Sequence, residues 1–247
     1  MLSSALLVAS IGAGQPISLG DPQGLLPAAY TNCDPSGNYQ EGYVSSSGSQ
    51  PMQYEGASAQ LTYEFGNICT QGDTTGNNVS TAWTMVFSND AKGWAQSGLL
   101  YIYVWSYWHH FAQQEYGYPT NTPATKYGSC VNQGEVHQAW QQLKFNGTSY
   151  YMSSNIDTTP LLQSSWDPLQ HWTQPFYVEF DGETHHDNSD IPGYSSTRTV
   201  WSSMQVQNYA NDSWYSVCSN VNFSNVVAAR YSEATVACNQ VQAWTSG

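Results

Sequence analysis

Charge is the scarcest property of this sequence. Only 9% of its 247 residues are Asp, Glu, Lys or Arg, whereas a soluble domain usually carries about 25%. Five basic residues stand against eighteen acidic ones, which gives a net charge of −13. Because no basic patch is present, nucleic acids and anionic membrane surfaces are poor partners. The polar surface must be built from uncharged Ser, Thr, Asn, Gln and Tyr, and such a surface loses few ion pairs in acid.

Long apolar runs, cysteine motifs and familiar catalytic motifs are also missing. No run reaches the roughly 20 apolar residues that span a bilayer. A G-x-S-x-G elbow and a glycine-rich nucleotide loop are both absent, so we expect no nucleotide cofactor. The five cysteines include no CxxC pair, which argues against structural zinc. We expect the disulfides Cys218–Cys238 and Cys69–Cys130, with Cys33 left over.

The N-terminal part of the chain differs from the rest. Met1–Gly14 contains a short apolar run followed by small residues, as in a secretory signal, although the positive n-region is missing. We therefore predict a secreted, extracellular protein; the alternative is a disordered or strand-forming terminus. Gln15–Gln53 is rich in Gly, Pro, Ser and Asn and predicts an extended arm. The predicted division is an arm over 1–53 and one folded domain over 54–247.

From Met52 onward, short β-type runs alternate with turn clusters such as Gly72–Asn78. Many strands, few helix caps and no βαβ alternation predict a single all-β domain, an antiparallel β-sandwich. Gln138–Leu143 also has helical spacing, but we favour a strand. The expected strands are Ala59–Phe65, Thr81–Phe87, Gly93–Tyr103, His137–Phe145, Ser149–Ile156, Phe176–Phe180, Arg198–Asn208, Trp214–Val221, Val226–Ala229 and Ala237–Trp244.

Two features could carry chemistry. Gln96 lies two residues into the second strand of a strand–turn–strand segment that is rich in aromatic residues. Nothing in that strand requires a buried amide, so its side chain either satisfies a backbone group or faces a ligand. Glu179, Asp181 and Glu183 are spaced so that one strand would place all three on one face. Their repulsion would raise at least one pKa, as a general acid or base requires; alternatively, they face solvent.

The histidines invite a metal interpretation. His109-His110 and His185-His186 are adjacent pairs, and adjacent residues of a strand point to opposite faces. A metal site would need His109 or His110 to meet His171 or His185 from another strand. We predict no metal, and expect polar histidines near aromatic rings.

Two families resemble parts of the chain. Glu179-Phe180-Asp181-Gly182-Glu183 resembles the E-x-D-x-E signature of laminarinase- and lichenase-type β-glucanases. Four segments of this chain resemble segments of the fungal-type glutamic peptidases, and they occur in the same order as in that family. They are Ala82–Val86, Trp94–Gly98, Glu115–Pro119 and Phe180–Thr184. Plant neprosin-like peptidases share a similar Gly-Glu strand. The sequence also looks like secreted Gram-positive-type proteins without an assigned activity. The fold that these resemblances imply is a concanavalin-like jelly roll.

Each resemblance implies a set of roles. The peptidase resemblance makes Gln96 the oxyanion donor and Glu183 the general base of an acid-acting hydrolase that cleaves polypeptides. The glucanase resemblance makes Glu179 the nucleophile and Glu183 the acid/base of a retaining mechanism on a polysaccharide. A glycan-binding module and a non-catalytic surface protein remain alternatives. Residues expected to support catalysis are Glu115, Asp181 and Glu179, and those expected to line a substrate cleft are Trp83, Trp94, Tyr101 and Tyr103.

Overall fold

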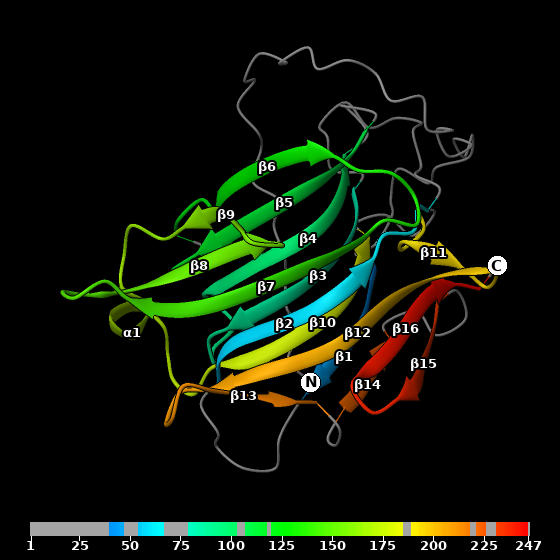
Figure 1. The fold of residues 1–247 in the computed structure, drawn as a ribbon. Helices are drawn as coiled ribbons and strands as arrows, with labels where there is room; N and C mark the ends of the chain where they lie inside the picture. Colours follow the sequence, from blue (N-terminus) through cyan, green and yellow to red (C-terminus); the bar gives the residue numbers. More distant parts are fainter. Residues whose placement is uncertain are drawn as a thin grey trace.

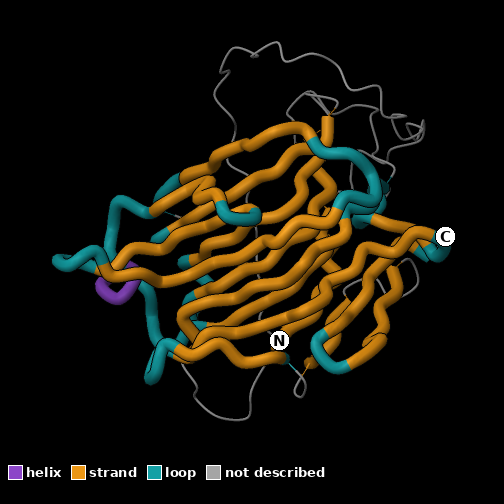
Figure 2. The backbone as a smooth tube through the Cα atoms, in the orientation of Figure 1, coloured by secondary structure: helices purple, strands orange, loops and turns teal. Residues whose placement is uncertain are grey.

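The computed structural model describes residues 40–46, 54–66, 79–102, 107–117, 120–184, 189–217, 221–225 and 231–246. These residues form sixteen strands and one four-residue helix, α1 (Pro168–His171). The strands make two sheets that lie one behind the other (Figures 1 and 2). Every described strand pair is antiparallel except β11 (Gly193–Tyr194) with β16 (Gln240–Thr245). The predicted all-β antiparallel sandwich is therefore confirmed.

One sheet has seven strands, and it includes a segment predicted to be part of an arm. Its order is β14 (Val221–Asn225), β1 (Gln40–Ser46), β10 (Tyr177–Thr184), β3 (Val79–Phe87), β4 (Trp94–Ile102), β5 (Tyr107–Glu115) and β6 (Ala124–Cys130). Strand β1 pairs with β10 on one side and with β14 on the other. The boundary predicted at residue 53 is therefore wrong, because the sandwich already includes residues 40–46.

The other sheet has nine strands. Its order is β15 (Tyr231–Ala237), β16, β11, β12 (Thr197–Asn208), β2 (Tyr54–Thr62), β7 (Val136–Phe145), β8 (Tyr150–Ile156) and β9 (Thr159–Gln163), with β13 (Ser213–Ser216) paired to β12. The ambiguous segment 138–143 lies inside β7, so the prediction of a strand is confirmed.

The core lies between the two sheets and contains buried polar groups as well as apolar ones. On β4, Ala95 and Leu99 are fully buried in the main apolar cluster. Ser97 lies between them, and its hydroxyl receives a 2.6 Å hydrogen bond from the side-chain amide of Gln141 on the opposite sheet. The indole N–H of Trp201 donates to a backbone carbonyl of β3 at 2.9 Å. Alternation along a strand therefore gives the seven-stranded sheet an inner face, toward the nine-stranded sheet, and an outer face.

A tight turn between β3 and β4 fixes the register of these two strands. The Ser88 N–H donates to the Gly93 carbonyl at 2.8 Å, and the Gly93 N–H donates to the Ser88 hydroxyl at 2.9 Å. A Cβ at Gly93 would lie 2.1 Å from the indole nitrogen of Trp172, so only glycine fits there. With the turn closed in this way, Gln96 lies directly opposite Met85.

The cysteines correct one prediction. Cys130 carries a free thiol, so the predicted Cys69–Cys130 disulfide is wrong. Cys33, Cys69 and Cys218 lie outside the described residues, and the pairing of Cys218 with Cys238 stays a prediction. Within the described part of the chain, no helix is long and apolar enough to cross a membrane.

Candidate active site

A row of side chains crosses five strands on the outer face of the seven-stranded sheet. The register pairs Glu179 with Met85, Met85 with Gln96, Gln96 with Gln113, and Gln113 with Thr125. Directly paired residues of neighbouring strands point to the same face. Glu179 (5% exposed), Gln96 (1%) and Gln113 (3%) are all buried. We call these five residues the outer row; it brings one carboxyl group and two amides into line.

Gln96 and Glu183, the two residues that the sequence predicted to be catalytic, lie on the same face, but Glu183 is outside the outer row. Glu183 pairs with Thr81, which pairs with Leu100. Gln96 is therefore two strands away from both glutamates, but Glu183 lies four residues further along. Standard strand spacings put the Cα of Gln96 about 10 Å from that of Glu179 and about 16 Å from that of Glu183. Glu179 is thus the nearer carboxyl group.

The amide of Gln96 is held by its neighbour in the outer row. Its Nε2 donates to Gln113 Oε1 at 2.9 Å, and the same oxygen accepts a 3.3 Å hydrogen bond from the indole N–H of Trp94. Gln113 Nε2 donates to the hydroxyl of Thr125 at 3.1 Å. The Gln96 Oε1 is buried and has no hydrogen-bond partner among the described residues. One N–H and the oxygen of this amide therefore remain for a ligand.

A narrow, mostly apolar pocket opens beside Gln96. The Trp83 ring meets Phe111 edge to face, with centroids 6.4 Å apart. Burial raises the pKa of Tyr127 to about 12, so its phenol is neutral at any physiological pH. The described lining is therefore uncharged and mostly apolar, and the volume of the pocket, about 10 Å³, is room for about one water molecule. Its lining residues are Val79, Thr81, Trp83, Gln96, Leu100, Phe111, Gln113, Thr125 and Tyr127.

The acidic stretch forms part of one strand, as its spacing predicted. Glu179, Asp181 and Glu183 all lie on β10 and are at most 5% exposed, so they do not face solvent. Between them Phe180 points into the core between the sheets. Three carboxyl groups therefore share one buried outer face, which is an environment that can tune a general base.

The remaining predicted site residues have different surroundings. Glu115 is also on the outer face, where its Oε1 accepts hydrogen bonds of 2.7 Å from the backbone N–H groups of Tyr116 and Gly117. It thus holds the turn after β5. Tyr101 is on the inner face and packs in the core between the sheets, away from Gln96. Tyr103 lies outside the described residues.

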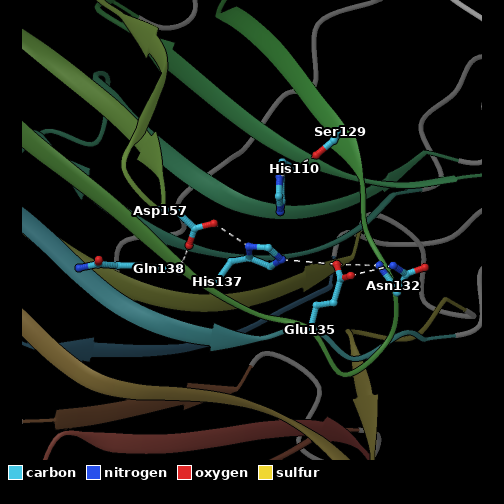
Figure 3. A network of polar contacts seen from close by, with 7 residues as sticks. All are labelled: His110, Ser129, Asn132, Glu135, His137, Gln138 and Asp157. Carbon is cyan, nitrogen blue, oxygen red and sulfur yellow. Dashed lines mark hydrogen bonds and ion pairs between the residues drawn. The ribbon is translucent and has the colours of Figure 1, made fainter. Parts of the chain in front are cut away.

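A histidine pair joins the two sheets at another place (Figure 3). His110 of β5 meets His137 of β7 with ring centroids 4.5 Å apart. His137 Nδ1 lies 2.8 Å from Asp157 Oδ2, and its Nε2 lies 3.4 Å from Glu135 Oε2. Burial, and then the proximity of His137, lower the pKa of His110 to about 4. The partner of His110 is thus a residue that the sequence did not suggest, and His185 lies outside the described residues.

No metal centre emerges from this cluster. Among the residues with described positions, no group of three His, Cys, Asp or Glu side chains could hold a metal ion. The contacts of His137 are instead those of an imidazole between two carboxylates, one in the β8–β9 turn and one just before β7.

Gln113 and Thr125 are the site residues that sequence reasoning missed. Both belong to strands, β5 and β6, that were not predicted. The adjacent amides Gln113-Gln114 were the available signal, because on a strand one of them must face each side of a sheet.

Comparison with solved structures finds proteins of similar fold. The chain is similar to SCP-B, a member of the eqolisin family of peptidases, solved with the tripeptide Ala-Ile-His. The TM-score is 0.51 and the identity 11%, over 85% of this chain and 98% of that one. A second similar structure is SCLam, a non-specific endo-β-1,3(4)-glucanase from family GH16, with a TM-score of 0.40 and 11% identity, over 78% of this chain and 58% of that one.

The likeness to SCP-B supports the peptidase resemblance at the level of the fold. Eqolisins are glutamic peptidases, the family that the ordered segments of the sequence resemble. At 11% identity the likeness to SCP-B shows the fold alone, and the roles of individual residues must come from their geometry. No known protein-family model and no curated protein matches the sequence.

Proposed function

We propose that this protein is a secreted, acid-acting peptidase in which Gln96 and a glutamate of β10 hydrolyse peptide bonds. The observation that carries the proposal is the outer row, which aligns the Gln96 amide with the Glu179 carboxyl group on one buried face. Glu179 is the better candidate for the general base, and Glu183, the residue indicated by the sequence, is the alternative.

The proposed chemistry needs one water molecule and these two side chains. The ionised glutamate takes a proton from the water as the water oxygen attacks the peptide carbonyl carbon. The electrons of the carbonyl double bond move to its oxygen, which accepts a hydrogen bond from the second N–H of Gln96. The protonated glutamate then gives its proton to the leaving nitrogen as the C–N bond breaks. The products are a carboxylic acid and an amine, and the glutamate is ionised again.

Both groups suit acidic conditions. The amide of Gln96 is neutral at every pH and donates equally well in acid. A buried carboxyl group beside two others can stay partly protonated under conditions in which an isolated one would be fully ionised. The sparsely charged sequence is compatible with the same conditions, since few surface ion pairs are lost as carboxylates are protonated.

The pocket beside Gln96 limits what a bound peptide could place there. Trp83, Leu100 and Phe111 supply apolar walls, and none of the described lining residues is charged. Because the pocket holds only about 10 Å³, which is room for about one water molecule, we expect no large side chain of the peptide to enter it.

The direct test is digestion of casein at about pH 2 to 5 with matched glutamate variants. Glu179→Gln should lower the initial rate by about 10²–10⁴-fold, while Glu183→Gln should retain most of it. The control is Glu64→Gln, which changes a carboxyl group outside the outer row. The reverse pattern would make Glu183 the base, and full activity in both variants would refute the peptidase proposal.

A glycan-cleaving function has one observation in its favour. Glu179 and Glu183 share a face of β10, as a retaining carboxylate pair would. Such a pair needs its carboxyl groups about 5–5.5 Å apart; since the two Cα atoms are about 13 Å apart, both side chains would have to lean toward each other along the strand. Release of reducing sugar from β-glucan that is abolished by Glu179→Ala and unaffected by Gln96→Ala would favour this function over the peptidase.

A further inference from the structure

We propose that Trp94 and Gln113 are positioning residues that fix which end of the Gln96 amide faces the reacting groups. This inference rests on the proposed function, because it assigns to Gln96 the task of donating to an oxyanion. It starts from a difference between the three side chains: an amide can present either its oxygen or its NH₂, whereas an indole N–H can only donate.

The indole settles the orientation of Gln113. Trp94 Nε1 lies 3.3 Å from one of the two terminal atoms of the Gln113 amide, and because an indole N–H can only donate, that atom must be the oxygen. The NH₂ of Gln113 is then directed to the hydroxyl of Thr125, at 3.1 Å, where it can donate. A reversed Gln113 amide would set its NH₂ against the indole N–H, and a buried donor facing a donor is unfavourable.

Gln113 in turn settles the orientation of Gln96. The oxygen that accepts from Trp94 also lies 2.9 Å from one end of the Gln96 amide, which must therefore be its NH₂. Trp94 and Gln96 thus both donate to Gln113 Oε1, and each of the two amides has one orientation that fits these hydrogen bonds. This arrangement leaves Gln96 with its second N–H and its Oε1 in a fixed direction, and both are buried.

This arrangement matters for catalysis because an oxyanion donor works best when it is oriented before the reaction begins. If the Gln96 amide could invert, its oxygen would take the place of the donor in part of the molecules. The indole of Trp94 is 4% exposed, and the sequence suggested that it binds substrate. Its hydrogen bond to Gln113 instead makes it a residue that orients Gln96 through Gln113.

The test is Trp94→Phe, made in the natural chain and in a Gln113→Glu background. Phenylalanine keeps an aromatic ring but lacks the N–H. In the natural chain we expect kcat for peptide hydrolysis to fall about tenfold with little change in KM. Both oxygens of an ionised carboxylate accept, so at the less acidic end of the assay range the side chain introduced by Gln113→Glu needs no indole to align it. In that background, Trp94→Phe should change kcat less than about twofold.

A purely structural role for the tryptophan ring would lower kcat equally in both backgrounds, and that result would overturn the proposal. So would an unchanged kcat for Trp94→Phe in the natural chain. Thermal melting of all four proteins checks that each is folded.

A measurement that needs no activity separates this inference from the proposed function. The side-chain amide signals of Gln96, identified by their loss in Gln96→Ala, should form one set in the ¹H–¹⁵N spectrum of the natural chain. In Trp94→Phe they should shift or double as the inverted amide becomes populated, and Gln113→Glu with Trp94→Phe should restore one set. Unchanged signals in Trp94→Phe would refute the orienting role, whereas an inactive natural chain with the expected spectra would refute only the peptidase.

Discussion

Gln113 and Gln114 are neighbours on β5, but their amides serve opposite faces of the same sheet. Gln114 points inward, and its Nε2 donates to the Met152 carbonyl at 3.1 Å and to the Ser154 hydroxyl at 2.8 Å, both on the opposite sheet. Gln113 points outward, and its side-chain hydrogen bonds to described residues join Trp94, Gln96 and Thr125 of its own sheet. The inner amide ties two sheets together, whereas the outer one orients another amide.

This contrast extends to the other buried polar groups of the seven-stranded sheet. Inner-face groups have partners across the sandwich, as Ser97 does with Gln141, so we expect them to determine stability. On the outer face, Gln96 and Gln113 line a pocket, so we expect these two amides to determine activity. Buried amides of the same chemical type can therefore be assigned different tasks by the face on which they lie.

The largest effect should come from the outer face. Gln96→Ala is expected to lower the rate of peptide hydrolysis by about 10²–10³-fold, the usual result of removing one oxyanion donor. Steady-state kinetics on an apolar peptide at acidic pH measure this loss. Gln114→Ala is the matched control on the inner face, and it should keep nearly full activity at temperatures where it is folded. Equal losses in the two variants would remove the distinction between the faces.

A substitution on the inner face should lower stability and leave activity unchanged. Gln141→Ala removes donors to Ser97 and to the Thr84 carbonyl, so buried acceptors lose their partner. We expect the free energy of unfolding to fall by about 1–3 kcal/mol, with activity unchanged. Urea denaturation measures it. Gln133→Ala, which removes an exposed amide, is the control and should cost much less.

Glu55 should make stability fall as the pH rises. It lies on the same side of β2 as the core residues Ala57 and Ala59, and is 3% exposed. Burial, then a hydrogen bond and charge from Asp212, raise its pKa to about 8. The stabilisation from protonated Glu55 is complete below the unfolded pKa near 4.5 and is lost as the pH rises toward 8. Melting temperatures of Glu55→Gln across this range should decline less than those of the natural chain; parallel curves would contradict the assignment.

His110 should have a smaller effect with the opposite sign. Burial and His137 lower its pKa from 6.5 to about 4, opposed in part by Asp157 and Glu135, while His109 lowers it slightly further. Its contribution to stability is complete above pH 6.5 and is lost as the pH falls toward 4. In His110→Gln the melting temperature should depend less on pH in that range, and the pH profile of activity should not change. A shifted activity profile would mean that this inner-face residue acts on the site.

The sequence predicted the strands β3 and β4 of the site well, because a cluster of turn residues separates two runs that are rich in apolar and aromatic residues. It also predicted correctly that Glu179, Asp181 and Glu183 share a face, because side chains on a strand repeat every two residues. It could not tell which glutamate lies in the row of Gln96. That depends on the register of β10 against β3, which pairs segments about a hundred residues apart and leaves no local pattern.

There are also physical reasons why the sequence did not predict some of the strands. Among the strands that were missed, β1, β5 and β6 contain many polar residues, and their apolar alternation is weak. On β5, the buried amides Gln113 and Gln114 satisfy their donors by hydrogen bonds that only the folded structure supplies. A pattern that counts such residues as solvent-facing cannot identify a strand whose two faces are both covered.

The cooperation of Gln96 and Glu179 is tested most directly by a double-mutant cycle. The measured quantity is kcat/KM for a peptide at about pH 4, for the natural chain, Gln96→Ala, Glu179→Gln and the double variant. If both side chains act on one tetrahedral intermediate, kcat/KM of the double variant should be nearly the same as that of the less active single variant. Losses that simply multiply, or full activity in either single variant, would contradict the account.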